Sequence, residues 1–253
     1  MQHHAKRTIV GVIPARLAST RLPGKVLRPI CGRPMLYHVF ARASRCGLLD
    51  DLVVATDSKE VYDYCVGNRM KVRMTSSCHA SGTDRIHEVM QTLSADIYVN
   101  IQGDEPMIRP AHLEVLLQSF LKDPSVQVGT VKTLITAEEA HNPNCVKVVT
   151  DLDGRALYFS RHAIPYNRDR IAEIGYFKHL GIYAYTGPAL QRFHQLLPSL
   201  LEQTEKLEQL RFLEHGIPIS VVETPYDTIG VDTEEDLARV ERYFQERESL
   251  ESA

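Results

Sequence analysis

Apolar and polar residues alternate along the first half of the chain in blocks that predict strands and amphipathic helices in turn. Residues 8–13, T-I-V-G-V-I, form a short continuous apolar run, which is typical of a central parallel strand covered on both faces. Residues 34–45 place apolar side chains three and four positions apart behind a proline, which predicts a helix. By the same criteria we expect strands over 52–55, 71–74 and 97–101, and helices over 58–67, 83–93 and 111–121.

Short connections between these blocks favour a mostly parallel, doubly wound sheet with helices on both faces. From about residue 125 the pattern changes to β-rich pieces broken by Asn-Pro and Asp-Gly turns. We expect a small mixed β subdomain there, over about 125–190, which serves as an insertion or dimerisation part of one domain spanning 1–253. Further along, the pattern predicts a helix over 205–215, a strand over 217–222 and a final helix capped by Thr233.

The composition argues against several classes of protein. The 253 residues carry a formal net charge of −3, which argues against a general nucleic-acid binder, and 43% hydrophobic residues argue against disorder. No apolar run approaches a membrane span, and the first residues lack a signal-peptide pattern, so we expect a soluble, cytoplasmic protein. The five cysteines form no C-x-x-C pair, which favours scattered reduced thiols over a disulfide framework or a zinc site.

The loop over residues 13–25, I-P-A-R-L-A-S-T-R-L-P-G-K, directly follows the first predicted strand. Ligands of doubly wound sheets bind outside the carboxyl ends of the strands. The loop contains neither the dinucleotide-binding glycine fingerprint nor a P-loop motif. It concentrates three cations, Arg16, Arg21 and Lys25, which can hold a polyphosphate by charge-assisted hydrogen bonds. The alternative is a solvated basic loop.

The stretch D-I-Y-V-N-I-Q-G-D-E-P, residues 96–106, contains the next candidate chemistry. Gly103 permits close approach of the backbone, and Asp104 follows the predicted strand at the carboxyl edge of the sheet. A carboxylate there can hold Mg²⁺ against a triphosphate. Alternatively, Asp104 begins a turn before Pro106.

A further carboxylate, Asp232, lies in G-V-D-T-E-E-D-L, just before the last predicted helix. It is a candidate second ligand of the same metal. Periodicity does not show that it meets Asp104, and an aspartate at a helix start is often structural.

Three segments of the second half place polar residues among apolar neighbours: Y-F-S-R-H-A-I-P-Y, H-L-G-I-Y-A-Y and E-K-L-E-Q-L-R. On the residues alone, these side chains are either partners within the core or rim, or ligand contacts. The candidates are Arg161, His179, Tyr185, Glu208 and Gln209.

Taken together, these motifs closely resemble the 3-deoxy-D-manno-octulosonate cytidylyltransferase (CMP-Kdo synthetase) family. The matching stretches, which include S-G-T-D-R at 81–85, are collinear and run from residue 9 to about 245. R-L-P-G-K and Q-G-D-E-P are the most specific of them. Val26 stands where the family often has proline, and His79-Ala80 varies before S-G-T-D-R, but neither departure removes a side chain that the chemistry needs.

The resemblance implies a Rossmann-like nucleotidyltransferase sheet, a homodimer and transfer of CMP from CTP to the sugar acid Kdo, with Mg²⁺ as cofactor. CTP and Kdo would be the small-molecule partners, without nucleic acid or membrane insertion, and the product would serve lipopolysaccharide or capsule biosynthesis. Asp104 and Asp232 would ligate the metal and, with Arg16 and Lys25, carry the catalysis. On the nucleotide side the resemblance implies Pro14, Ala15, Arg16, Arg21, Lys25, Ser81, Gly82, Thr83, Arg85 and Gln102. On the sugar-acid side it implies Gln102, Arg161, His179, Tyr185, Glu208 and Gln209, with Arg161 or His179 as the cation near the carboxylate.

Alternatives remain at this stage. The acceptor could be a related acid, such as 8-amino-Kdo or a sialic acid, and the motifs G-V-D-T-E-E-D and L-E-Q-L-R favour a Kdo-type acid. A nucleotide-binding module without catalysis would have lost Lys25, Asp104 or Asp232, and all three are present.

Overall fold

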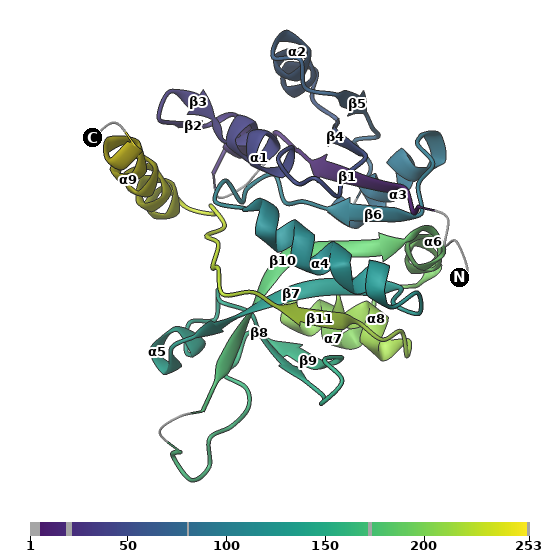
Figure 1. Ribbon diagram of the computed structural model, residues 1–253, viewed down its shortest axis with the longest axis vertical. Coiled ribbons are helices and arrows are strands. Elements are labelled where there is room, and N and C mark those ends of the chain that lie inside the picture. Colours follow the sequence, from purple (N-terminus) through teal and green to yellow (C-terminus); the bar gives the residue numbers. More distant parts are fainter. Residues whose placement is uncertain (1–5, 19–21, 80, 172–173, 252–253) are drawn as a thin grey trace. The chain divides into compact units, whose positions relative to one another are not determined.

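The apolar run near the N-terminus forms the buried strand β1 (Ile9–Pro14), which has a parallel neighbour on each side (Figure 1). In this computed structural model, residues 6–18, 22–79, 81–171 and 174–251 are described. They form two compact units, residues 1–113 with 228–253, and residues 114–227.

The first unit contains four parallel strands in the order β6-β1-β4-β5, as expected of strands joined by helical crossovers. A short antiparallel hairpin, β2-β3, precedes its first helix. The elements are β1, η1 (Lys25–Leu27, a 3₁₀ turn), β2 (Pro29–Ile30), β3 (Arg33–Pro34), α1 (Met35–Ala43), β4 (Asp51–Thr56), α2 (Lys59–Gly67), β5 (Val72–Met74), α3 (Gly82–Thr92), β6 (Ile97–Asn100), the start of α4 (Pro110–Lys122) and α9 (Glu234–Glu251).

Helix starts lie where polar caps occur in the sequence. Ser58 accepts a hydrogen bond from the amide of Val61 and caps α2. Ser81 and Asp84 form a reciprocal capping box at the start of α3. The predicted cap of the last helix is confirmed, since the Thr233 hydroxyl accepts from the amide of Asp236 at 3.2 Å.

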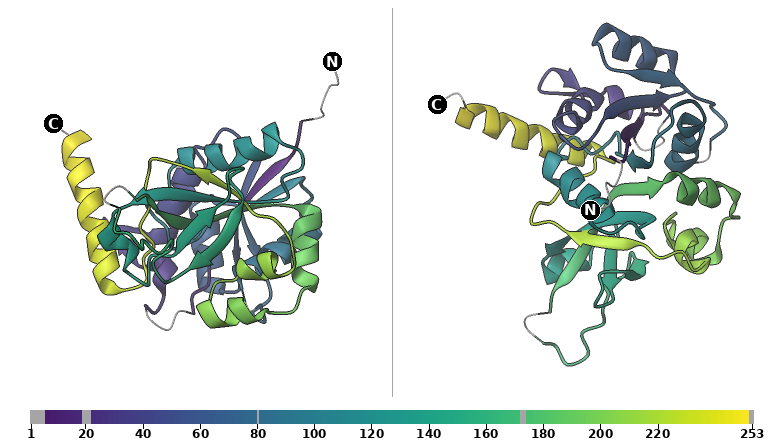
Figure 2. Two further views of the ribbon diagram at one scale, coloured as in Figure 1. Left: turned by 90° about the horizontal axis from the view of Figure 1, so that it is seen from below. Right: turned by 45° about the vertical axis from the view of Figure 1, so that its right-hand side comes forward.

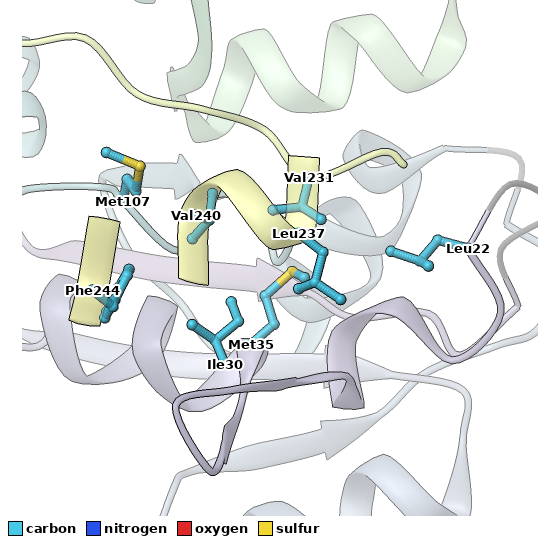
Figure 3. Close-up of a cluster of buried hydrophobic side chains, with 8 residues drawn as sticks. All are labelled: Leu22, Ile30, Met35, Met107, Val231, Leu237, Val240 and Phe244. Carbon is cyan, nitrogen blue, oxygen red and sulfur yellow. The ribbon is translucent and has the colours of Figure 1, made fainter. Parts of the chain in front are cut away.

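The C-terminal segment returns to the first unit and packs there. Val231, Leu237, Val240 and Phe244 are buried against side chains from the N-terminal part of that unit (Figure 3). Apolar burial on this scale holds the segment from Thr228 onward in place. The other members of this cluster are Leu22, Ile30, Met35 and Met107.

The second unit contains a mixed sheet. Strand β7 pairs with β11 in parallel and with β10 in antiparallel orientation, and β8 pairs with β10 and β9, both antiparallel. Residues 161–171, which follow β9, project away from these strands (Figure 2). The elements are most of α4, β7 (Val128–Ile135), α5 (Ala137–Ala140), β8 (Lys147–Thr150), β9 (Ala156–Ser160), β10 (Tyr176–Thr186), α6 (Gly187–Gln195), α7 (Leu200–Glu205), α8 (Leu210–Glu214) and β11 (Ser220–Glu223).

One helix of the second unit is shorter than the sequence predicts. Of the range 205–215, Leu210–Glu214 forms α8, whereas the left-handed conformation of Lys206 (φ 55°) ends the preceding helix α7 at Glu205.

A parallel sheet with connecting helices, joined to a mixed β part, confirms the predicted α/β class. Among the described residues, no helix has both the length and the apolar composition needed to cross a membrane. None of the five cysteines, all of which lie among the described residues, forms a disulfide.

Candidate active site

Lys25 lies at the start of a 3₁₀ turn, directly after a glycine in the left-handed conformation. Gly24 has φ 67°, which a residue with a side chain seldom adopts, and Val26 is buried beside Lys25. The Lys25 Nζ lies 2.6 Å from Asp104 Oδ2 and 2.9 Å from Asp232 Oδ1. The structure therefore brings together three predicted site residues that are far apart in the sequence.

Asp104 is positioned by the glycine before it. A Cβ atom at Gly103 would lie 2.8 Å from the carbonyl oxygen of Pro14, which is closer than Cβ atoms approach. Glycine therefore allows the chain after β6 to pass against the end of β1, and the expected close approach at Gly103 is confirmed.

Asp232 is brought to Asp104 by its own neighbours. The Val231 side chain is fully buried in the apolar cluster of Figure 3, and its amide donates to the carbonyl oxygen of Asp104 at 2.9 Å. On the other side, Asp236 Oδ2 accepts from the amides of Asp232 and Thr233. The backbone around Asp232 is thus fixed from both directions.

The surroundings of Lys25 favour its protonated form. Burial opposes the Lys25 charge, but attraction to Asp104 and hydrogen bonds to Asp104 and Asp232 outweigh it, so the pKa of Lys25 is raised. The side chain of Lys25 is 14% exposed, against 30% for Asp104 and 44% for Asp232. The lysine is therefore charged at neutral pH, and both carboxylates remain open to solvent on one side.

This arrangement fits a hard divalent cation. Two carboxylates converge on one positive charge, and carboxylate oxygens are the ligands that Mg²⁺ takes in proteins. Within the described residues, no group of three or more His, Cys, Asp or Glu side chains is arranged to hold a metal. Two protein ligands match the usual Mg²⁺ site, where substrate phosphates and water complete the shell.

Other predicted nucleotide contacts surround the end of β1. Ala15 is buried and its amide donates to Ala55 at 2.9 Å, which fixes the backbone where Pro14 ends the strand. Arg16 and Gln102 are half-buried, each just beyond a strand end. Arg21 lies outside the described residues.

The S-G-T-D-R motif forms the start of α3. Gly82 lies close to Pro14, since a Cβ at Gly82 would be 3.5 Å from the proline ring. The Ser81 hydroxyl is engaged in the capping box, and Thr83 is buried. The motif therefore brings a helix N-terminus next to the end of β1.

Arg85 has a structural role in the first unit. Its side chain is fully buried, with a hydrogen bond to Asp57 Oδ2 at 2.8 Å and another to the Thr75 hydroxyl. Its buried Nε has no hydrogen-bond partner among the described residues. A nucleotide contact of Arg85 stays a prediction.

Arg161 lies in the second unit, at the end of β9, and holds several backbone groups. Its Nε donates to the carbonyl of Glu205 at 2.8 Å, Nη1 to Pro143 at 3.1 Å and Nη2 to Lys206 at 3.5 Å. The Glu205 carboxylate in turn accepts from the Arg161 amide and the Ser160 hydroxyl. Arg161 thus has a structural role, and since a guanidinium has five N–H groups, two remain for a ligand.

His179 is buried among the strands of the second unit. Burial, assisted by the charge of Lys178, lowers its pKa to about 3. His179 is therefore neutral at physiological pH while no ligand is bound, which favours Arg161 as the cation near a sugar carboxylate. Its Nε2 lies 3.0 Å from the hydroxyl oxygen of Thr130.

The remaining predicted residues lie in the same unit. Tyr185 is buried between the rings of Tyr183 and Phe212, both at 5.8 Å. Glu208 and Gln209 precede α8, and the buried Gln209 Nε2 has no hydrogen-bond partner among the described residues. An unsatisfied buried amide of this kind is a candidate ligand contact.

Sequence analysis missed Asn100, Thr130 and Glu205. Asn100 ends β6 on the side of Gly82, and within the described part of the chain its buried Oδ1 has no hydrogen-bond partner. An asparagine at the end of an apolar strand was the available signal for it. Thr130 and Glu205 have no comparable signal, because they act through residues distant in the sequence.

Comparison with known proteins agrees with this geometry. The profile of the family described as "Cytidylyltransferase" matches residues 10–223. A 3-deoxy-manno-octulosonate cytidylyltransferase of Koribacter versatilis (strain Ellin345) is 58% identical over 238 residues, which cover 94% of this chain and 90% of the relative. The same enzyme of Geobacter sulfurreducens is 45% identical over 243 residues, covering 92% of this chain and 97% of the relative.

A solved structure supports the same family assignment. The structure of CMP:2-keto-3-deoxy-manno-octonic acid synthetase complexed with CTP is similar with a TM-score of 0.91 and 46% identity, covering 95% of this chain and 99% of that one. A glucose-1-phosphate thymidylyltransferase from Bacillus anthracis, at 16% identity and a TM-score of 0.65, shares the fold. The chain therefore belongs to the cytidylyltransferase family, among the 3-deoxy-manno-octulosonate cytidylyltransferases.

Proposed function

We propose that the chain activates Kdo with CTP through a site built on Lys25, Asp104 and Asp232. The anomeric hydroxyl of Kdo attacks the α-phosphorus of CTP, a new oxygen–phosphorus bond forms, and pyrophosphate leaves with the β- and γ-phosphates. The observation that carries the proposal is the convergence of two carboxylates on one charged lysine at the carboxyl edge of the parallel strands. This is where a doubly wound sheet binds its ligand.

Positioning and charge neutralisation are what phosphoryl transfer mainly requires. Lys25 remains protonated because its pKa is raised, so it offers a fixed cation to the triphosphate. Arg16 and Arg21, from the same loop, add further positive charge. The two carboxylates hold the Lys25 ammonium in place while no nucleotide is bound.

Cytidylyltransferases use a divalent metal ion, and we propose that it is Mg²⁺ held by Asp104 and Asp232. When bound, Mg²⁺ neutralises phosphate charge and stabilises the leaving pyrophosphate. The exposed sides of both carboxylates leave room for phosphate oxygens to complete the coordination.

For the nucleoside, we propose that Pro14, Ala15 and the start of α3 border the cytidine. The close approach of Gly82 to Pro14 supports a narrow site that reads the base through backbone groups. Ser81 and Thr83 shape this site, and Gln102 lies between the two substrates.

For the sugar acid, we propose contacts from the second unit. The two remaining N–H groups of Arg161 offer the charge that a carboxylate needs, since His179 is neutral. Tyr185, Glu208, Gln209 and His179 then contact hydroxyl groups.

We further propose a homodimer that uses the β-rich part of the chain. The large apolar side chains that are exposed in the second unit include Leu134, Leu157, Tyr166 and Ile171, all within the β-rich part. We propose that these side chains contribute to the subunit contact. We place the reaction in the cytoplasm, where cysteine thiols such as the five of this chain stay reduced.

An acceptor panel tests the proposed function. Pyrophosphate release is measured with CTP and Mg²⁺, using Kdo, 8-amino-Kdo and a sialic acid separately. We expect kcat/KM to be highest for Kdo. A higher kcat/KM for 8-amino-Kdo or the sialic acid would identify that acid as the acceptor in place of Kdo. No pyrophosphate release with any of the three acids would reject the proposed function.

A further inference from the structure

Strand β10 is irregular next to His179. Leu180 is opposite Val131 of β7, whereas Tyr183 is opposite Thr130, so Gly181 and Ile182 are two extra residues on the β10 side. An irregularity of this kind leaves backbone carbonyls without their ladder partners. Here the carbonyls of Leu180 and Ile182 both lie near the side chain of Thr130.

The hydroxyl of Thr130 supplies the missing donor. Its Oγ1 lies 2.8 Å from the carbonyl oxygen of Ile182 and 3.2 Å from that of Leu180. Carbonyl oxygens only accept, and a hydroxyl has one hydrogen to donate, so the hydrogen of Thr130 points toward these two carbonyls. Thr130 is buried, and leaving both carbonyls unsatisfied would be costly.

The same hydroxyl oxygen lies 3.0 Å from Nε2 of His179. Since the hydrogen of Thr130 is used by the carbonyls, its oxygen acts as an acceptor toward His179, and Nε2 must carry the ring hydrogen. A neutral imidazole has one N–H, so Nδ1 has a free lone pair. The low pKa of His179 agrees with a neutral ring.

Two aromatic rings also pack against the imidazole of His179. Phe159 packs edge-on against His179 with centroids 5.0 Å apart, and Tyr183 lies at 5.3 Å. Together with the Nε2 hydrogen bond, these contacts fix the orientation of the imidazole. A fixed, neutral ring with one unprotonated nitrogen is suited to accept a hydrogen bond from a hydroxyl.

We propose that Thr130 is a positioning residue that holds His179 in its Nε2–H tautomer, so that Nδ1 accepts a hydrogen bond from a hydroxyl of the sugar acid. The second half of this inference rests on the proposed function. His179 then selects for a hydroxyl on the acceptor, and the carboxylate is left to Arg161.

The tautomer is tested directly by ¹⁵N NMR of the histidine rings in the full-length protein at pH 7, with His179→Gln to assign the signal. We expect a protonated Nε2 and an unprotonated Nδ1 for His179. A proton on Nδ1, or an imidazolium, would overturn the assignment. This readout needs no substrate, so it stands apart from any failure of the proposed function.

Kinetics test the role in binding. Thr130→Val keeps the shape but removes the hydroxyl, and we expect the KM for Kdo to rise roughly three- to tenfold, with the KM for CTP unchanged. Thr130→Ser retains the hydroxyl and should restore both the Nε2–H signal and the KM. Thr133→Val, at another buried threonine of β7, is the matched control and should leave both KM values unchanged. An unchanged KM for Kdo in Thr130→Val, or failure of Thr130→Ser to restore it, would overturn the positioning role.

Discussion

The amide of Val231 donates a hydrogen bond to the carbonyl oxygen of Asp104 at 2.9 Å, and this contact aligns the two carboxylates of the candidate site. Val231 belongs to the buried cluster that anchors the C-terminal segment, so apolar packing determines where Asp232 lies. The catalytic geometry is in this way a consequence of core formation.

Replacing either carboxylate should lower the activity and leave the protein folded. We expect Asp104→Asn and Asp232→Asn each to lower kcat/KM by about a hundredfold or more, because each removes a charged oxygen ligand of the metal. The melting temperature should change by only a few degrees, since both side chains are partly exposed. Asp63→Asn, at an exposed carboxylate that pairs with Lys59 on the surface of α2, is the control. Full activity of both variants at ordinary Mg²⁺ would contradict the metal assignment.

Gly103→Ala should damage the site through the backbone. The added methyl group would lie 2.8 Å from the carbonyl oxygen of Pro14, so the chain must shift, at a cost of about 1–3 kcal/mol. We expect a lower midpoint in urea unfolding together with reduced turnover. Gly67→Ala is the matched control, because a Cβ there meets no atom within 4 Å. Equal behaviour of the two variants would show that the close approach is unimportant.

The buried His179 should make the protein less stable in acid. Its pKa is about 3 in the folded state and 6.5 in the unfolded chain. Between these values the unfolded chain binds the extra proton, so stability falls as pH decreases, by about 2 kcal/mol between pH 7 and pH 5 from this group. Urea unfolding at both pH values measures the difference.

Two variants test whether His179 causes this pH dependence of stability. His179→Phe should remove about 2 kcal/mol of the pH dependence, whatever its effect on stability at pH 7. Substitution of the exposed His141 by Asn is the matched control, because it removes a histidine from the surface of the same unit. If His179→Phe retains the full wild-type dependence, the histidine is not buried in its neutral form.

Arg161→Lys should change both stability and acceptor binding. An ammonium cannot reach the three carbonyls that the guanidinium holds, so we expect a loss of about 1–3 kcal/mol in unfolding free energy. The KM for Kdo should rise roughly tenfold, with that for CTP unchanged. Arg155→Lys, at an exposed arginine of the same unit, is the control. A stability loss without any change in the KM for Kdo would leave Arg161 with its structural role alone.

The sequence predicted those parts of the fold that depend on local pattern. β1 and β6 follow from short apolar runs, and the starts of α2 and α9 follow from Ser58 and Thr233. The helix expected over 205–215 forms only over Leu210–Glu214, and its predicted start was wrong because apolar spacing does not reveal the left-handed Lys206.

The site was predictable only in its separate pieces. Asp104 and Lys25 were singled out by their motifs, but their contact with Asp232 depends on the long-range packing of Val231. The burial of Arg85 depends on Asp57, which comes from another strand end, and no local pattern encodes that pairing.

The central claim, transfer of CMP from CTP to Kdo, is tested most directly by following the label of radioactive CTP in the presence of Mg²⁺. With ³²P at the α-position, we predict that the label appears in the sugar product when Kdo is added, and with ³²P at the γ-position that it appears in pyrophosphate. ATP and GTP carrying the same labels should give little product. A label from the α-position that never reaches the sugar, or comparable rates with ATP, would contradict this account.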